Sequence, residues 1–392
     1  MLIGIIGKPN VGKSTFFKAA TLANVLIANY PFVTIKPNHG IGYVKIDCID
    51  KDFNVKCNPR EGYCINSKRF VPIELLDVAG LVPGASEGKG LGNQFLDDLR
   101  QADAFIHIVD LSGKTNAEGK PTNNYYPGED IKFLEKEIDL WYSNILKKVW
   151  KTFSKQIEST KENFIQAITK QFSGLKVKEE DVNKIVLKLK LDIEKPTQWT
   201  EEEIFYFASN LRKETKPMII AGNKIDLEGA EENLKKIREE FNYPIIPCST
   251  DAELALREAS KAGLIEYIPG ENNFKILKNL NENQKIALEK IKKILEKYGS
   301  TGVQNILNYV VFDLLKYVAV FPAGTSKLTD SQGRVLPDCY LMPPNSTALD
   351  FAFRLHTDLG NNFIKAIDVK TKKVIGKDYI LRHKDAIEIL TR

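Results

Sequence analysis

The sequence predicts an α/β fold built on a mostly parallel sheet with helices on both faces. Two observations predict it: short apolar runs alternate with helical stretches, and polar loop motifs follow the ends of several of these runs. This alternation is typical of βαβ units. The expected strands span residues 2–6, 41–47, 70–77, 104–110, 217–222 and 244–248. Because ligands bind at the carboxyl ends of strands in such sheets, the motifs lie where a binding site is expected.

The first expected strand leads into Gly7–Ser14, GKPNVGKS, which matches the phosphate-binding pattern G-x-x-x-x-G-K-[ST]. Glycines let consecutive backbone N–H groups turn toward a phosphate, and the helix expected over 15–23 adds its dipole. We expect Lys13 to reach the terminal phosphates and the Ser14 hydroxyl to ligate Mg²⁺. The residues of this segment expected to bind nucleotide are Gly7, Lys8, Pro9, Asn10, Val11, Gly12, Lys13, Ser14 and Thr15.

Two further motifs indicate which nucleotide binds. Residues 77–80, DVAG, form a D-x-x-G motif after an expected strand, so Asp77 would hold Mg²⁺ through water and the Gly80 N–H would contact the terminal phosphate. Residues 223–226, NKID, form an N-K-x-D motif. The Asp226 carboxylate can accept two hydrogens from guanine, whereas adenine offers neither. Asn223 would brace the loop, and the stem of Lys224 would lie along the base.

A fourth motif follows the strand expected over 244–248. Ser249 and Thr250 occupy the place where GTPases have a small turn whose backbone N–H faces the guanine oxygen, although Thr250 replaces the usual alanine. The four motifs occur in the order found in GTPases, and together they predict a GTP- and GDP-binding site. His107 falls inside the apolar run 104–109, so we expect it in the core.

These motifs resemble those of the Obg-like GTPases, in particular the YchF subgroup and its archaeal-type relatives. The resemblance is carried by residues 29–34 (NYPFVT), 77–85 (DVAGLVPGA) and 88–96 (GKGLGNQFL). Residues 343–352 (PPNSTALDFA) and 364–366 (IKA) are similar to the TGS domain, a ubiquitin-like β-grasp module. The resemblance therefore implies a P-loop GTPase domain with a helical insertion and a C-terminal TGS domain.

The resemblance also implies roles for individual residues. Thr34 would be the switch I threonine that joins Ser14 and Asp77 around Mg²⁺. Leu81 stands where Ras-like GTPases have a water-orienting glutamine, which implies slow hydrolysis without a partner. Asn10 either ligates K⁺, as in related GTPases, or only shapes the loop. The residues expected to act in catalysis are Lys13, Thr34 and Gly80.

Several YchF relatives have lost the N-K-x-D motif and accept ATP, whereas this chain keeps it. We therefore expect hydrolysis of GTP to GDP and phosphate. The alternatives are an Obg-like ATPase and a nucleotide-dependent binding switch with negligible hydrolysis. The resemblance implies a ribosome or another RNA-containing assembly as partner, with the TGS domain or the helical insertion as a possible contact for a protein.

The expected division of the chain has a GTPase domain in two parts, 1–113 and 216–270. A helical insertion spans 114–215, connecting helices span 271–316, and the TGS domain spans 317–392. Helices are expected over 128–172, 179–190, 201–213, 282–298 and 303–315. Lysines of the insertion form either a solvated face or an arm that contacts a partner.

The bulk composition is that expected of a cytoplasmic protein without a membrane span. No apolar run approaches the roughly 20 residues that cross a bilayer. The net charge of +5 allows weak attraction to RNA without demonstrating it. Five cysteines without a C-x-x-C pair indicate reduced thiols. Cys57 and Cys64 flank a turn, and are either two strand-end thiols or a pair that approaches closely or shares a metal.

Overall fold

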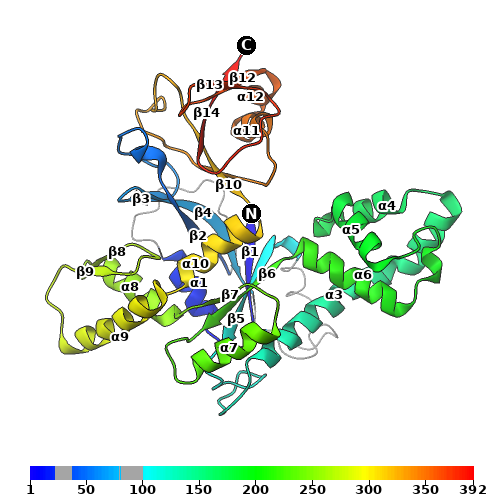
Figure 1. The fold of residues 1–392 in the computed structure, drawn as a ribbon, viewed down its shortest axis with the longest axis horizontal. Helices are drawn as coiled ribbons and strands as arrows, with labels where there is room; N and C mark the ends of the chain where they lie inside the picture. Colours follow the sequence, from blue (N-terminus) through cyan, green and yellow to red (C-terminus); the bar gives the residue numbers. More distant parts are fainter. Residues whose placement is uncertain (23–37, 79, 81–99) are drawn as a thin grey trace. The chain divides into compact units, whose positions relative to one another are not determined.

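The computed structural model describes residues 1–22, 38–78, 80 and 100–392 (Figure 1). Thr34 and Leu81, with the matching segments 29–34 and 88–96, therefore lie outside the described residues. The chain forms two compact units. The first comprises Met1–Phe17 and Glu74–Asp251, and the second comprises Lys18–Ile73 and Ala252–Arg392.

The main sheet has seven strands in the order β2-β4-β1-β5-β6-β7, with β3 beside β4. Its strands are β1 (Leu2–Ile6), β2 (His39–Asp47), β3 (Tyr63–Ile65), β4 (Lys68–Asp77), β5 (Ala104–Asp110), β6 (Met218–Asn223) and β7 (Ile245–Pro247). The pairs β1–β4, β1–β5, β5–β6 and β6–β7 are parallel, whereas β3–β4 is antiparallel. The expected mostly parallel sheet is confirmed.

The central strands are buried on both faces. Every residue of β1 and of β5 is buried, which explains why both read as continuous apolar runs. The parallel pairing places the carboxyl ends of β4, β1, β5, β6 and β7 side by side at one edge of the sheet. The register sets Ile5 opposite Asp77 and Asp110 opposite Asn223, so the four sequence motifs converge there.

The first unit also contains the helical insertion. Its helices are α3 (Gly128–Thr160), α4 (Phe164–Gln171), α5 (Glu179–Leu189) and α6 (Glu201–Thr215), and α7 (Ala230–Glu240) follows β6. Helices α3 and α6 run antiparallel. The last residue of α6, Thr215, forms a hydrogen bond with Tyr142 of α3, whereas the first residue of α6, Glu201, forms an ion pair with Lys147 later in α3. The first and last helices of the insertion thus form an antiparallel pair.

The single helix expected over 128–172 is wrong, because the chain breaks it in two. Lys161 ends α3 in the left-handed conformation, and Asn163 caps α4 by accepting a hydrogen bond from the Gln166 N–H. Helical spacing of apolar residues continues across the break because both helices contribute to one aromatic cluster. In that cluster Trp150 contacts Phe153 on α3 and Phe164 on α4.

The second unit contains further helices, a two-stranded sheet and a β-grasp module. The elements before the module are α8 (Thr250–Lys261), β8 (Ile265–Tyr267), β9 (Phe274–Ile276), α9 (Glu282–Tyr298) and α10 (Val303–Asn308). Helix α9 matches its expected bounds. The helix expected over 303–315 instead changes to π-helical geometry over Tyr309–Leu314.

The module has a five-stranded sheet in the order β11-β10-β14-β12-β13. Its elements are β10 (Val318–Pro322), β11 (Tyr340–Met342), α11 (Ala348–Leu355), α12 (Thr357–Asn361), β12 (Phe363–Asp368), β13 (Lys373–Ile375) and β14 (Asp385–Thr391). Phe351 of α11 is fully buried with Val320 and Ile387 of the sheet. In the part of the chain that the structure describes, no helix has the length and hydrophobicity needed to cross a bilayer.

Candidate nucleotide-binding site

The loop after β1 depends on two glycines. Gly7 and Gly12 have φ angles of 147° and 99°, which side chains rarely adopt. A Cβ at Gly7 would lie 2.6 Å from the carbonyl oxygen of Ile108, and one at Gly12 would lie 2.3 Å from the Asn223 amide nitrogen. Both positions therefore require glycine for backbone conformation and for space. Helix α1 (Lys13–Thr21) begins directly after this loop, so its free N–H groups face the expected phosphate position.

The phosphate loop and the D-x-x-G motif meet at the end of β4. The Ser14 hydroxyl donates to Asp77 Oδ2 at 3.0 Å. The Lys13 ammonium donates to the carbonyl of Lys8 at 2.7 Å, and a Cβ at Gly80 would lie 3.2 Å from that ammonium. Two oxygen ligands suited to Mg²⁺ are thus adjacent, which fits the ion expected for this motif.

Burial shifts the pKa values of Lys13 in the phosphate loop and Asp77 in the D-x-x-G motif. It lowers the pKa of Lys13 to about 8, and the nearby Asp77 carboxylate partly opposes that shift. Burial also raises the pKa of Asp77, against the hydrogen bond from Ser14 and the charge of Lys13. Each charged group has lost hydration without fully recovering it from the protein. An anion beside Lys13 and a cation beside Asp77 would replace that hydration.

Asn223 joins three parts of the site. Its side-chain amide donates to the carbonyl of Val11 in the phosphate loop at 2.8 Å. Its side-chain oxygen accepts from the backbone N–H of Thr250 at 3.1 Å and from the thiol of Cys248 at 3.8 Å. This residue therefore fixes the phosphate loop and the turn after β7 to the end of β6. The sequence predicted such a bracing role for Asn223.

Lys224 has a partner that the sequence analysis did not identify. Its ammonium lies 2.7 Å from Asp110 Oδ2 and also donates to the Asn10 carbonyl at 3.2 Å. Asp110 also accepts hydrogen bonds from Ser112 and Thr115. Burial opposes the charge of Asp110, but the hydrogen bonds from Lys224 and Ser112 outweigh it and lower the pKa. The sequence did contain a signal, since Asp110 ends an apolar strand as Asp77 does.

The groups expected to read the base are partly accessible. Asp226 is exposed in the turn after β6. Ser249 and Thr250 are buried beside the loop, and a Cβ at Gly12 would lie 3.4 Å from the Thr250 hydroxyl. The arrangement leaves the Asp226 carboxylate available to a ligand, while the backbone of the turn after β7 is held by Asn223.

Two side chains of the phosphate loop are hydrogen-bonded to the segment that follows β5. The Lys8 ammonium pairs with Asp130 Oδ2 of α3 at 2.8 Å, donates to the Thr115 carbonyl and lies over the Tyr125 ring. The Asn10 amide donates to the Gly119 carbonyl at 3.0 Å. The Lys8 ammonium is thus occupied by protein partners, whereas the side-chain oxygen of Asn10 forms no hydrogen bond with the described residues. Neither Asp130 nor Gly119 carried a local sequence signal.

His107 is buried as expected. Burial lowers its pKa to about 3, so the imidazole is neutral at physiological pH. It lies on β5 beneath the phosphate loop, where a Cβ at Gly7 would be 3.6 Å from the ring. We interpret His107 as a core residue that supports the loop.

The fold and this site define a P-loop protein of the guanine-nucleotide-binding class. Three family models match successive parts of the chain: a 50S ribosome-binding GTPase model at residues 2–155, an Obg-like GTPase YGR210-like, G4 motif-containing domain at 221–324, and a TGS domain at 328–391.

Similar proteins cover the whole chain. An uncharacterised GTP-binding protein of Methanocaldococcus jannaschii is 50% identical over 100% of this chain and 99% of its own length. The crystal structure of a GTP-binding protein from Pyrococcus horikoshii is 42% identical, covers 100% of both chains and has a TM-score of 0.80. The ribosome-binding ATPase YchF of Bacillus subtilis is 28% identical over 98% of this chain and 97% of that protein. This chain belongs to the Obg-like GTPase family, with the YchF-type architecture that ends in a TGS domain.

Proposed function

We propose that this protein binds GTP and hydrolyses it to GDP and phosphate. The observation that carries the proposal is the position of Asn223, which links the N-K-x-D motif directly to the phosphate loop. The proposed guanine-binding motif and the phosphate-binding loop are thereby hydrogen-bonded to each other. Selectivity for GTP and the hydrolytic reaction are the parts of this proposal that experiment must test.

Each proposed role follows from the position of a side chain. Lys13 and the first N–H groups of α1 bind the phosphates and offset the charge that develops during transfer. Ser14 and Asp77 would hold Mg²⁺, which would supply positive charge to offset the negative charge of the phosphates. The backbone N–H of Gly80 contacts the terminal phosphate from beside Lys13. Thr34, which lies outside the described residues, is proposed as a further metal ligand from the sequence alone.

The decisive experiment is a titration of nucleotide-free protein with fluorescent GDP, followed by a chase with GTP or ATP. We expect ATP to displace the probe at least about tenfold less well than GTP, a difference of about 1.4 kcal/mol. The reason is that adenine would leave the Asp226 carboxylate without its two donors. Equal displacement by the two nucleotides would overturn the proposal.

An adenine-nucleotide hydrolase is the second candidate, because similar proteins carry the name ribosome-binding ATPase YchF. The same chase separates the two candidates. A variant gives an independent check: Asp226→Asn should shift preference from GTP toward xanthosine triphosphate, because the amide can donate to the extra carbonyl of xanthine. If Asp226→Asn keeps the GTP preference of the unmodified protein, Asp226 does not read the base.

Hydrolysis is proposed to be slow unless a partner assists it, because Leu81 offers no group that orients water. Asn10 is proposed as a ligand for K⁺, since its amide is bound to Gly119 and its side-chain oxygen forms no hydrogen bond with the residues that the structure describes. Phosphate release measured in potassium and in sodium buffer tests this role. Faster release in potassium is expected, and equal rates would leave Asn10 a purely structural role.

The proposed setting is the ribosome or another RNA-containing assembly. Support comes from the names of the similar proteins and of the 50S ribosome-binding GTPase model. The TGS module and the insertion are the proposed contact regions. Mixing the protein with ribosomes and sedimenting them tests the association, and the absence of co-sedimentation in every nucleotide state would contradict it.

A further inference from the structure

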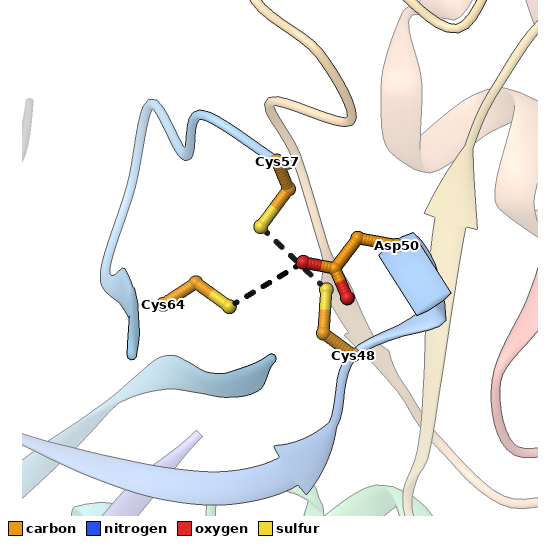
Figure 2. A group of neighbouring side chains, drawn as sticks. All are labelled: Cys48, Asp50, Cys57 and Cys64. Atoms are coloured by element: carbon orange, nitrogen blue, oxygen red, sulfur yellow. Dashed lines mark hydrogen bonds between the residues drawn. The ribbon is translucent and has the colours of Figure 1, made fainter. Parts of the chain in front are cut away.

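Four side chains of types that can ligate a metal ion lie close together in the second unit. None of them belongs to the four nucleotide-binding motifs. Cys48 follows β2, Asp50 lies in the short 3₁₀ helix Ile49–Lys51, Cys57 lies in the following loop, and Cys64 lies in β3. Figure 2 shows the three thiols and the carboxylate directed toward one another. The sequence left open whether Cys57 and Cys64 share a metal, and it did not identify Cys48 or Asp50 as neighbours.

The distances suit one small ion. One ligand atom from each of the four residues lies within 4.8 Å of every other. The sulfurs of Cys48 and Cys57 are 3.7 Å apart, and the Cys64 sulfur is 4.0 Å from Asp50 Oδ2. With Zn–S bonds of about 2.3 Å, two sulfurs of a tetrahedral site are separated by about 3.8 Å. The site is therefore close to the size of a single tetrahedral ion.

The carboxylate in this group lacks the partners that burial demands. Asp50 is only 2% exposed, and its Oδ1 has no hydrogen-bond partner among the described residues. A buried unpaired carboxylate is costly unless a cation or several donors compensate it. Cys48 and Cys57 are buried as well, so water compensates this group poorly.

A buried arginine supplies part of the charge balance. Arg69 of β4 is fully buried and donates to the carbonyls of Leu336 and Pro337 at 3.1 and 2.8 Å. Arg69 is close enough to Cys57 for its positive charge to act on that sulfur. Three thiolates and one carboxylate around a divalent ion leave a net charge of about −2, which one nearby guanidinium partly offsets.

We propose that Cys48, Asp50, Cys57 and Cys64 form a structural zinc site. Zinc prefers tetrahedral coordination by thiolates and carboxylates, and four protein ligands leave no open position for catalysis. On binding, each thiol that is protonated releases its proton to solvent and its sulfur becomes a thiolate ligand. A redox cluster is disfavoured, because thiols this close match the ligands of a single ion.

The site would fix the loop between β2 and β3. That loop already contacts the segment before β11, through hydrogen bonds from Asn58 N–H to Val335 O and from Arg60 N–H to Pro337 O. An ion pair between Arg60 and Asp338 adds to them. A zinc ion would thus hold in place the loop that contacts the β10–β11 connection of the TGS module within the same unit.

The test is the metal content of the full-length protein, produced in zinc-supplemented medium, purified with a reducing agent and passed over a weak chelating resin. We expect one zinc per chain by elemental mass spectrometry. Cys64→Ser and Asp50→Asn should reduce zinc severalfold, while Cys339→Ser should keep it. Cys339 is the matched control because it is a nearby thiol outside the group of four. Retained binding of fluorescent GDP shows that each variant is folded.

A second measurement does not depend on variants. Cobalt added to the zinc-stripped protein should give the visible ligand-field absorption of a tetrahedral thiolate site, and zinc should abolish it. The proposed site would be overturned if the purified protein held no more zinc than the buffer background and the cobalt-treated protein lacked this absorption. Equal zinc loss in Cys339→Ser would overturn the choice of ligands, and one equivalent of iron would overturn the choice of zinc. A Cys48–Cys57 disulfide in the reduced preparation would likewise contradict it.

Discussion

At the scale of single residues, Lys13 combines a functional position with an electrostatic cost. The residue is 9% exposed, and burial lowers its pKa from 10.5 to about 8. Between these two values the unfolded chain binds more protons at Lys13 than the folded chain does. Stability therefore rises with pH through this window, and below it the charged amine lowers the free energy of unfolding by up to about 3 kcal/mol.

Replacing Lys13 separates these two effects. Lys13→Met should raise the free energy of unfolding of nucleotide-free protein at pH 7 by about 1–3 kcal/mol, and should abolish GTP turnover. It should also flatten the rise in stability between pH 8 and 10.5. Urea denaturation at several pH values measures the free energy of unfolding and its dependence on pH. Lys155→Met, on the exposed face of α3, is the control and should leave the pH slope unchanged. A destabilised Lys13→Met protein would contradict the argument.

Asp110 provides a second prediction at the residue scale, because it pairs with Lys224, whose stem is proposed to lie along the base. Asp110→Asn removes the charge that pairs with the ammonium but keeps a similar shape. We expect GDP and GTP affinity to fall by about tenfold, with the ratio of GTP to ATP affinity unchanged. Titration with fluorescent nucleotides measures all three affinities. A loss of selectivity, as expected instead for Asp226→Asn, would show that Asp110 takes part in reading the base.

At the scale of elements, the break between α3 and α4 offers a local test. Lys161 ends α3 with a φ of 59°, a conformation that costs most residues about 1 kcal/mol and costs glycine little. Lys161→Gly should stabilise the protein by about 0.5 kcal/mol after the entropy of glycine in the unfolded chain is included. Lys155→Gly, inside α3, should destabilise it by about 1 kcal/mol. Chemical denaturation compares them, and the same sign for both would refute a left-handed cap.

The elements that the sequence predicted best are those with the simplest burial. Strands β1 and β5 match their expected bounds, because burial on both faces gives an uninterrupted apolar run. The three-residue strands β3, β8 and β9 were not expected, since so few residues show no period. The helix break at Lys161 was missed because apolar spacing continues through it, and a lysine in a left-handed conformation has no local signature.

The candidate site likewise has features that the sequence predicted and features that it did not. Motifs whose backbone follows a strand were predictable, because the parallel sheet brings the strand ends together. Side-chain partners from distant segments were not. Lys8 pairs with Asp130 of α3, and Cys48 and Asp50 join Cys57 and Cys64, through tertiary packing that leaves no spacing rule in the chain. The domain boundaries and the functions of the site residues stay predictions.

At the scale of the whole molecule, a nucleotide switch must couple its site to a partner. A partner can shift the balance between GTP- and GDP-bound protein only if it contacts the two states differently. Thermodynamic linkage makes this effect reciprocal. If ribosomes bind the GTP-bound protein about tenfold more tightly than the GDP-bound protein, they must raise its preference for GTP over GDP by the same factor.

Two independent measurements can therefore test the proposed partner. The first is the affinity for ribosomes with GDP and with a non-hydrolysable GTP analogue, and the second is the affinity for each nucleotide with and without ribosomes. We expect the two ratios to agree, and Lys13→Met to show no difference between nucleotide conditions. Attraction of a chain of net charge +5 to ribosomal RNA would weaken with salt but would not depend on the nucleotide. If added salt abolishes ribosome binding and the bound nucleotide does not alter it, the association is purely electrostatic and the proposed switch is rejected.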